Sequence, residues 1–516
     1  MPSAPGTVVR STFGSRGRTL SWSHALEHAR ADAGLWTFAA GGLATALFLR
    51  LWDLNALGYN SDEAVYAGQA AALAHVPALT PYFPIFRAHP LLFQTIHSLG
   101  YRLGTGDPFG RVLAGSFGLG TVFLVFKLGD LLYGRRTGII AAVFIALMPY
   151  DVLVSRQVLL DGPMTFFATL TLYLVARFAV SRKPVWLYAA GGAMGLTVLG
   201  KETSILIVGA AYAFFALSPD VGARARDLAI AAGVMALTIA PYPVALRLAG
   251  HSQSGQQYLA YQLFRRPNHN WTFYPATVPL AVGPLLVLSA ALGLWLLHRE
   301  ISWRETLLLS WIAIPALFFQ LYPVKGFQYL LPTAPAFAVL AARTLGRTGR
   351  RPLGLAAAVI VAVSLAIPAW QRIQPATSGT FLAGSGGVPG GRELGRWIGS
   401  HVPSGAEILA IGPSMANIVE FYGHRQTYGL SVGPNPLRRN PAYEPIPNPD
   451  LAIRTNEVQY LVWDAYTADR TPFFANKLLG YARRYNGRVV YSATIPIRSD
   501  GANSTRQLIV VYAVRR

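Results

Sequence analysis

The sequence predicts a polytopic α-helical membrane protein that ends in a small α/β domain. Of its 516 residues, 53% are hydrophobic and 13% are charged, whereas an average soluble domain has about 25% charged residues. Repeated apolar runs are long enough to cross a hydrocarbon core roughly 30 Å thick. After residue 390, these runs give way to short strand-like and helix-like segments. Membrane helices followed by an α/β domain are the simplest explanation of this change.

The chain opens with a basic, polar stretch over residues 1–32. It has no short apolar core followed by a small-residue cleavage site, so we interpret it as a cytoplasmic tail rather than a cleaved signal peptide. Within it, residues 21–30 could form a short helix on the membrane surface.

Hydropathy predicts about eleven membrane spans within a transmembrane domain over residues 33–370. The apolar segments are, in order, 33–52, 110–132, 138–154, 161–180, 185–200, 203–218, 227–248, 277–297, 305–322, 327–344 and 353–370. A further segment, 90–103, is apolar but short, and could be a span or an interfacial helix.

The positions of basic residues favour one topology. The formal net charge is +21, which in a soluble protein would suggest nucleic acid; here we expect the basic residues to mark cytoplasmic loops. With the N-terminus inside and 90–103 interfacial, all the main basic loops fall in the cytoplasm: 135–136, 182–183, 224–226, 298–304 and 343–351. We therefore predict a multi-pass protein of the plasma membrane whose C-terminal domain is extracytoplasmic, with no nucleic-acid partner.

Residues 371–391 are rich in glycine and are predicted to be a linker, followed by an α/β domain over 392–516. Strands are expected at 408–411, 460–463, 489–491 and 508–514, and helices at 392–400, 414–422 and 471–485. The chain has no cysteine, which excludes disulfides and thiolate metal sites.

Asp62 and Glu63 are the most informative residues, because adjacent carboxylates at a membrane boundary are costly unless a proton, metal or substrate uses them. One carboxylate could face a reacting group while the other orients a neighbour or binds metal. The alternative is that both stabilise the N-terminus of a helix. Tyr66 follows on the same segment and is a further candidate.

The predicted topology brings other ionisable residues to the same external face. His89 could bind a metal or a phosphate. Asp161 could be another catalytic acid or a helix cap, and Arg156 could bind a phosphate or pair with Asp161. Lys201 could hold a lipid phosphate or pair with Glu202.

Two later segments complete this external face. Lys325 follows one span and precedes the next, so it could bind phosphate or extend toward the membrane surface. The loop 249–276 is polar and aromatic and could cover a site. A set of carboxylates, cations and apolar walls suits a substrate with an anionic head and a hydrocarbon tail.

The motifs that carry these residues resemble those of the GT-C glycosyltransferases, which use lipid-linked sugars. The resemblance covers residues 35–345 and is greatest to the protein O-mannosyltransferases and the aminoarabinose transferases of lipid A. It rests on residues 62–67, 89–91, 155–163 with 166–167, 200–203, and Lys325 with 328–332, which include the candidate Tyr329. The chain departs from its relatives at Gln328, where they often have Arg, and after Pro90, where they often have a second Pro.

This resemblance implies a GT-C fold and an inverting transfer from a polyprenyl-phosphate sugar to a lipid, glycan or protein hydroxyl. Asp62 would be the general base, with Glu63 and Asp161 positioning acceptor or metal. The leaving phosphate would meet Arg156, Lys201 and Lys325. Some relatives use a divalent cation, and Mg²⁺ or Mn²⁺ would suit the oxygen ligands Glu63 and Asp161 together with His89.

Two other functions compete with this one. A transporter or flippase of lipid-linked saccharides would also have many spans, but it usually places charges near the membrane midplane. A binding or scaffold protein would act through residues 370–516, where we recognise no motif.

Overall fold

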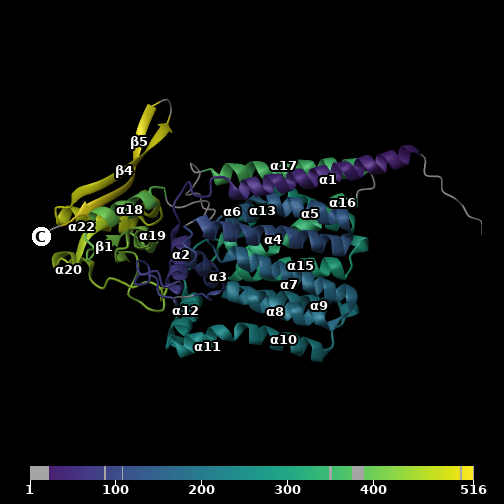
Figure 1. Cartoon of the computed structure of the whole chain (residues 1–516), viewed down its shortest axis with the longest axis horizontal. Helices are drawn as coiled ribbons and strands as arrows, with labels where there is room; N and C mark the ends of the chain where they lie inside the picture. Colours follow the sequence, from purple (N-terminus) through teal and green to yellow (C-terminus); the bar gives the residue numbers. More distant parts are fainter. Residues whose placement is uncertain are drawn as a thin grey trace, which may run out of the picture.

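The computed structural model describes residues 22–86, 89–106, 108–347, 351–374, 389–499 and 502–514. It consists of a long helical bundle with a small sheet domain at one end (Figure 1). Residues 1–21 of the predicted tail and most of the predicted linker lie outside the described residues. The helix α1 begins at Trp22, so residues 22–30 extend the first membrane helix instead of forming a separate one.

The bundle is built from apolar helices whose buried faces form one large core. Its elements are α1 Trp22–Leu51, α4 Pro108–Tyr133, α5 Arg135–Leu147, α6 Pro149–Ser155, α7 Asp161–Ser181, α8 Pro184–Gly200, η1 Glu202–Ile205, α9 Leu206–Leu217, η2 Pro219–Val221, α10 Ala225–Ile239, α13 Phe273–Val282, α14 Pro284–Leu296, η3 His298–Glu300, α15 Trp303–Leu321, η4 Phe327–Thr333, α16 Ala334–Gly346 and α17 Arg351–Ile373.

Each segment expected to span the membrane overlaps a helix or a pair of consecutive helices. Within the described residues, 6 helices are long and apolar enough to cross, or up to 8 if each bent pair is one span. The bent pairs are α5 with α6, at 60°, and α13 with α14, at 97°. Two shorter apolar helical segments, over 184–200 and 202–217, account for further predicted spans. The total of about eleven crossings stays a prediction.

A layer of short helices lies between the bundle and the sheet domain (Figure 1). It includes α2 Ser61–Leu73, α3 Leu92–Arg102 and α12 Ser252–Phe264, whereas α11 Pro241–Leu248 continues α10 within one candidate span. The helix α3 covers the ambiguous segment 90–103 and has 11 residues. At 1.5 Å per residue it is only about 16 Å long, too short to cross a hydrocarbon core.

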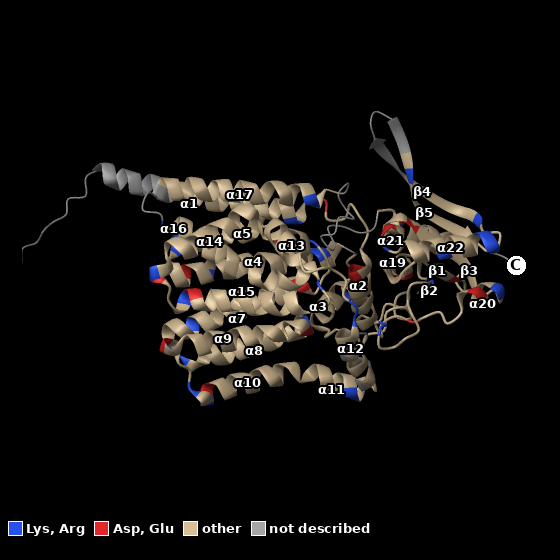
Figure 2. Cartoon of the chain, turned by 180° about the vertical axis from the view of Figure 1, so that it is seen from behind, with Lys and Arg blue, Asp and Glu red and all other residues tan. Residues whose placement is uncertain are grey.

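Charged residues gather at the two ends of the bundle, and the body between them is almost free of them (Figure 2). This distribution is what a membrane requires, because an ionised group in hydrocarbon is strongly disfavoured. One charged end faces the sheet domain, and the candidate site lies there.

The C-terminal domain contains a 5-stranded sheet in the order β2-β1-β3-β5-β4. Its strands are β1 Glu407–Ala410, β2 Thr427–Gly429, β3 Val458–Asp464, β4 Arg488–Ser499 and β5 Ala502–Ala513. Strand β1 is parallel to β2 and β3, whereas β5 is antiparallel to β3 and β4. Helices α18 Gly391–His401, α19 Pro413–Gly423, α20 Pro449–Arg454, α21 Ala465–Arg470 and α22 Pro472–Arg484 accompany the sheet.

The sheet domain is attached to the helix that carries the candidate acid. Helix α19 packs on α2, where the Asn417 side-chain amide donates to Ser61 Oγ at 2.9 Å. The Tyr422 hydroxyl accepts from the backbone N–H of Tyr59 at 2.8 Å, just before α2. These bonds fix the domain against the first residues of α2.

Candidate active site

The start of α2 is fixed by a capping box. Asn60 Oδ1 accepts from the backbone N–H groups of Asp62 and Glu63 at 2.9 and 3.0 Å. The Glu63 carboxylate returns a bond by accepting from the backbone N–H of Asn60 at 3.1 Å. Such boxes satisfy the free N–H groups at a helix start. Asp62 and Glu63 consequently leave the same turn in different directions.

Glu63 is fully buried and saturated with hydrogen bonds. Arg111 binds it in bidentate fashion, through Nε to Oε1 and Nη2 to Oε2, both at 2.8 Å. The backbone N–H of Val158 donates to Oε1 at 3.0 Å. The carboxylate therefore joins α2, α4 and the segment before α7, which leaves little capacity for the predicted contact with acceptor or metal.

Asp62 differs from Glu63 in exposure and in hydrogen bonding. Its side chain reaches solvent, and its carboxylate forms no hydrogen bond or ion pair with any residue that the structure describes. The surrounding protein removes part of the hydration of this carboxylate, which raises the pKa of Asp62 above its usual value, although Lys201 and His89 act in the opposite direction. The nearby negative charge of Asp161 raises this pKa further. An accessible carboxylate with a raised pKa is well suited to accept a proton.

Asp161 and Lys201 form a buried ion pair, with Lys201 Nζ 2.9 Å from Asp161 Oδ1. Asp161 is the first residue of α7, and Lys201 lies at the break between α8 and η1. The pair thus connects two helix ends beside Asp62. The ammonium group also lies 5.4 Å from the ring centre of Tyr329, in range of a cation–π interaction.

His89 and Glu202 form a second polar pair, with His89 Nδ1 2.8 Å from Glu202 Oε2. The Tyr258 hydroxyl lies 3.4 Å from His89 Nε2, and the Tyr242 hydroxyl donates to the His89 carbonyl at 3.1 Å. The ring of Tyr66 is 6.0 Å from that of His89, edge on. This cluster brings α2, η1, α11 and α12 together.

Sequence reasoning missed Arg265 and Tyr258 as site residues. Arg265, directly after α12, lies within electrostatic range of Tyr329, the ring beside Lys201, and its Nη1 donates to Gln262 Oε1 at 3.2 Å. Its guanidinium group also lies 5.3 Å from the ring centre of Tyr261. The aromatic residues of the loop 249–276 gave a signal, but the loop alone did not indicate which cation faces the site.

Arg156 and Lys325, both predicted to bind phosphate, bind backbone carbonyls at helix ends. Arg156 donates to the carbonyls of Leu49 and Trp52 at 2.6 and 2.8 Å, at the end of α1. Lys325 Nζ donates to two carbonyls at the end of α15, each at 3.0 Å. Cations are stabilising at helix C-termini. These contacts give both residues a helix-capping role, and their predicted phosphate role stays a prediction.

The predicted metal ligands do not come together. Glu63 is bound to Arg111, Asp161 to Lys201, and His89 to Glu202. Within the part of the chain that the structure describes, no three His, Asp or Glu side chains are grouped so as to hold a metal ion. The residues present do not fit the divalent-cation site that we expected.

The sheet domain contributes to the surroundings of Asp62. Tyr466 in α21 is close enough for the charge of Asp62 to raise its pKa, in addition to the larger effect of burial. The guanidinium group of Arg470 lies 4.2 Å from the ring centre of Tyr466. An accessible acid thus lies between a cationic cluster in the bundle and aromatic and cationic groups of the domain.

Comparison with known proteins agrees with this architecture. Residues 88–245 match the family described as dolichyl-phosphate-mannose-protein mannosyltransferase. An uncharacterized protein of Aquifex aeolicus (strain VF5) is 25% identical over 306 residues, which are 55% of this chain and 60% of that protein.

Solved structures are similar over nearly the whole chain. ArnT from Cupriavidus metallidurans in the apo state has a TM-score of 0.68 and 15% identity, covering 92% of this chain and 97% of that chain. The apo oligosaccharyltransferase of Archaeoglobus fulgidus has a TM-score of 0.60 and 14% identity, covering 92% and 74%. The resemblance inferred from the motifs is therefore confirmed, and the chain has the fold of the GT-C superfamily.

Proposed function

We propose that this protein transfers a sugar from a polyprenyl phosphate to a hydroxyl group of an extracytoplasmic acceptor. The acceptor oxygen attacks the anomeric carbon on the side opposite the phosphate, so the configuration inverts. The bond from that carbon to the phosphate oxygen breaks, and the electron pair leaves with the lipid phosphate.

Asp62 is the general base in this proposal and accepts the proton of the acceptor hydroxyl. The observation that carries the proposal is the contrast between two adjacent acids: Glu63 is saturated, whereas the carboxylate of Asp62 is accessible and forms no bond with the described residues. Its raised pKa moves it toward the range in which a base is effective near neutral pH.

Lys201 and Arg265 are the proposed phosphate ligands. Lys201 Nζ lies 5.4 Å from the ring centre of Tyr329 and Arg265 lies within electrostatic range of the same residue, so both cations are near Tyr329. Positive charge there stabilises the lipid phosphate as its negative charge grows during bond cleavage. Asp161 keeps Lys201 protonated and in place through their 2.9 Å ion pair.

A lipid-phosphate donor is supported by what related folds bind. ArnT from Cupriavidus metallidurans, with a TM-score of 0.66 to this chain, was solved bound to undecaprenyl phosphate. AglB from Archaeoglobus fulgidus, with a TM-score of 0.58, was solved with a dolichol-phosphate and an inhibitory peptide. An oligosaccharyltransferase of Archaeoglobus fulgidus was also solved in complex with zinc and sulfate. The proposed reaction has no step that uses a metal.

The proposed orientation places the N-terminus in the cytoplasm and the sheet domain outside, as the positive-inside rule predicts. The donor sugar would then be presented from the outer leaflet to the charged end of the bundle that faces the sheet domain (Figure 2).

The experiment uses the purified full-length protein in liposomes with a panel of radiolabelled polyprenyl-phosphate hexoses and pentoses, and a crude extract of the envelope as acceptor source. We expect release of free polyprenyl phosphate together with transfer of label to the acceptor. Movement of an intact lipid-linked sugar across the bilayer, with no release of lipid phosphate from any donor, would instead identify a flippase.

A further inference from the structure

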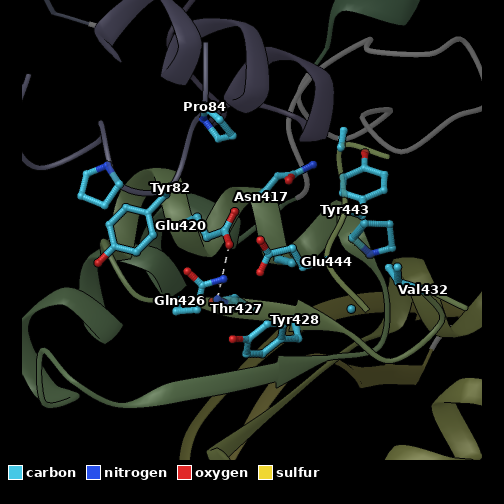
Figure 3. A pocket seen from close by; sticks show the side chains of 15 residues that line it. Tyr82, Pro84, Asn417, Glu420, Gln426, Thr427, Tyr428, Val432, Tyr443 and Glu444 are labelled. Atoms are coloured by element: carbon cyan, nitrogen blue, oxygen red, sulfur yellow. Dashed lines mark hydrogen bonds between the residues drawn. The ribbon is translucent and has the colours of Figure 1, made fainter. Parts of the chain in front are cut away.

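An apolar groove of about 360 Å³ lies on the bundle between α1, α4 and α5. All of its lining residues are alanine, valine, leucine, isoleucine, phenylalanine or tryptophan. A cavity between the sheet domain and the loop that connects α2 to α3 differs from it, because polar side chains such as Gln426 and Glu444 line that cavity (Figure 3). The groove on the bundle offers almost only hydrocarbon surface, which suits a hydrocarbon ligand.

The packing of the three helices creates the groove. Helices α1 and α4 both pack on α5 but make few contacts with each other. Gly42 lets α1 approach α5 closely, since a Cβ atom at this position would lie 2.7 Å from Val143 Cγ2. Ala142 of α5 contributes a small side chain to the floor, whereas the exposed rings of Trp36 and Phe123 form walls. The groove therefore has α5 as its floor and α1 and α4 as its sides.

The groove runs along the helix axes and is about as long as one leaflet is deep. On α5 it is lined by Ile139, Ala142, Val143 and Ala146, a spacing that places all four on one face of the helix. From Arg135, the first residue of α5, to Ala146 the helix rises about 16 Å at 1.5 Å per residue. This is about half of a hydrocarbon core roughly 30 Å thick. The groove thus matches one acyl chain in direction and in length.

The groove starts at the end of the bundle that is away from the candidate active site. Helix α6, which follows α5, is the nearer of the two to the sheet domain (Figure 1), so α5 begins at the opposite end. In the proposed orientation this end is cytoplasmic. The polyprenyl-phosphate donor would enter from the other leaflet, so the groove is not part of the proposed donor site.

Arg135 lies at the start of the groove. Its guanidinium group is 4.6 Å from the ring centre of Trp36, which lines the groove. The Arg135 side chain is exposed, and it forms no ion pair or hydrogen bond with any residue in the described part of the chain. Its planar donors are therefore available, and they match the geometry of phosphate oxygens.

The other charges near this end leave it positive. Asp130 of α4 lies close to α5, since a Cβ atom on Gly138 would be 3.1 Å from Asp130 Cβ. The charge of Asp130 is balanced by Lys127 on the same helix, and neither forms an ion pair among the described residues. Arg135 and Arg136 then contribute a net positive charge, which attracts an anionic group.

We propose that this groove binds one phospholipid with an anionic headgroup from the leaflet at this end of the bundle. One acyl chain lies along α5 between α1 and α4, and the headgroup phosphate accepts hydrogen bonds from Arg135. The ring of Trp36 stabilises the guanidinium group through a cation–π interaction. Basic pockets between membrane helices are suited to anionic headgroups of the cytoplasmic leaflet. The site is separate from the proposed reaction and does not depend on it.

Native mass spectrometry of the purified full-length protein measures this binding. Phosphatidylglycerol and phosphatidylcholine with the same acyl chains are added separately, so only the headgroup charge differs. We expect the first phosphatidylglycerol to bind about tenfold more tightly than the first phosphatidylcholine, as for one hydrogen bond to a charged group. The preference should shrink as the ionic strength rises. Equal affinity for the two lipids would overturn the proposal.

Variants of Arg135 locate the preference. Arg135→Gln should remove most of it, and Arg135→Lys should keep part, because the charge remains but the planar fork is lost. The matched control is Arg224→Gln, which changes another exposed arginine that does not line the groove and should leave the preference unchanged. A full preference in Arg135→Gln, or an equal loss in both glutamine variants, would contradict the site.

A further variant and a competitor identify the occupant. Ala142→Phe fills the floor of the groove and should weaken the first binding event of both lipids; unchanged binding in the folded variant would place the lipid elsewhere. Polyprenyl phosphate at equal concentration should not displace the bound phosphatidylglycerol. Displacement would make the groove a donor site and overturn the proposal. None of these measurements requires sugar transfer, so they stand or fail separately from the proposed function.

Discussion

Two sets of charged side chains lie near the end of the bundle that faces the sheet domain, and they serve different purposes. The arginine layer, consisting of Arg50, Arg111 and Arg156, binds buried carboxylates and helix-end carbonyls. The site cluster, consisting of Asp62, the Asp161–Lys201 pair and the His89–Glu202 pair, includes an acid without a partner among the described residues. A charged residue whose hydrogen bonds are all made within the protein stabilises the structure, whereas one with a free carboxylate can take part in the reaction.

The neighbours Asp62 and Glu63 show this difference most sharply. The capping box directs the Glu63 side chain toward Arg111 of the arginine layer, and the Asp62 side chain points toward the site cluster. Side chains one residue apart on a helix start point in different directions, so a single turn supplies both a structural and a reactive carboxylate. The predictions below change one set at a time.

The largest effect on stability is expected from Glu63→Gln in the arginine layer. The variant leaves the buried guanidinium of Arg111 without its bidentate partner, and breaking such a pair destabilises a protein by about 3–5 kcal/mol. Thermal unfolding in detergent measures the loss. The control is Glu393→Gln, an exposed residue 3.5 Å from Arg392, which should leave the melting temperature nearly unchanged.

Lys201→Met tests the site cluster. The variant keeps the length of the side chain and removes the charge proposed to stabilise the leaving phosphate, so kcat should fall about 100-fold. Lys325→Met removes an ammonium group that caps α15 and should lower the melting temperature with kcat largely preserved. Equal losses of kcat in both variants would contradict the assignment of Lys201 to the leaving phosphate and of Lys325 to helix capping.

Arg265→Ala is expected to have a smaller effect. Arg265 is half-buried and lies near Tyr329, so its loss should weaken donor use about tenfold, as for one hydrogen bond to a charged group. Steady-state kinetics with the donor varied measure this. Arg266→Ala, at the exposed neighbouring position, is the matched control.

The pH profile is expected to show a modest shift. A general base works only when deprotonated, so kcat/KM should fall on the acid side through an apparent pKa above that of an ordinary aspartate. Because Lys201 lowers the pKa of Asp62, Lys201→Met should move this acid limb to higher pH. If the acid limb does not move in that variant, the limb does not report the protonation of Asp62.

Sequence patterns predicted the helices well because apolar length is a local property. Most strands were found for the same reason, but β2 has only three residues and is held by pairing with β1. The spacing of Asn60 and Glu63 is a capping-box signature. This signature predicts that Glu63 bonds the start of its own helix.

Other parts of the site depended on tertiary contacts that no local pattern carries. Arg111 is 48 positions from Glu63 and begins an apolar helix, where it resembles an ordinary boundary residue. Arg156 and Lys325 satisfy the carbonyls of helix ends, which compete with phosphate for the same donors. Arg265 comes near Tyr329 because α12, which it follows, lies at the end of the bundle (Figure 1).

The most direct test of this account is Asp62→Asn, measured for transfer rate and for stability on the same preparation. A raised pKa in the folded state means that Asp62 favours folding below its ordinary pKa, and that this contribution is lost as the pH rises through the raised value. At neutral pH the variant should thus unfold at the same or a higher temperature, while single-turnover transfer falls by about 10²- to 10⁴-fold. Transfer within twofold of wild type, in a folded variant, would contradict the assignment of Asp62 as the base.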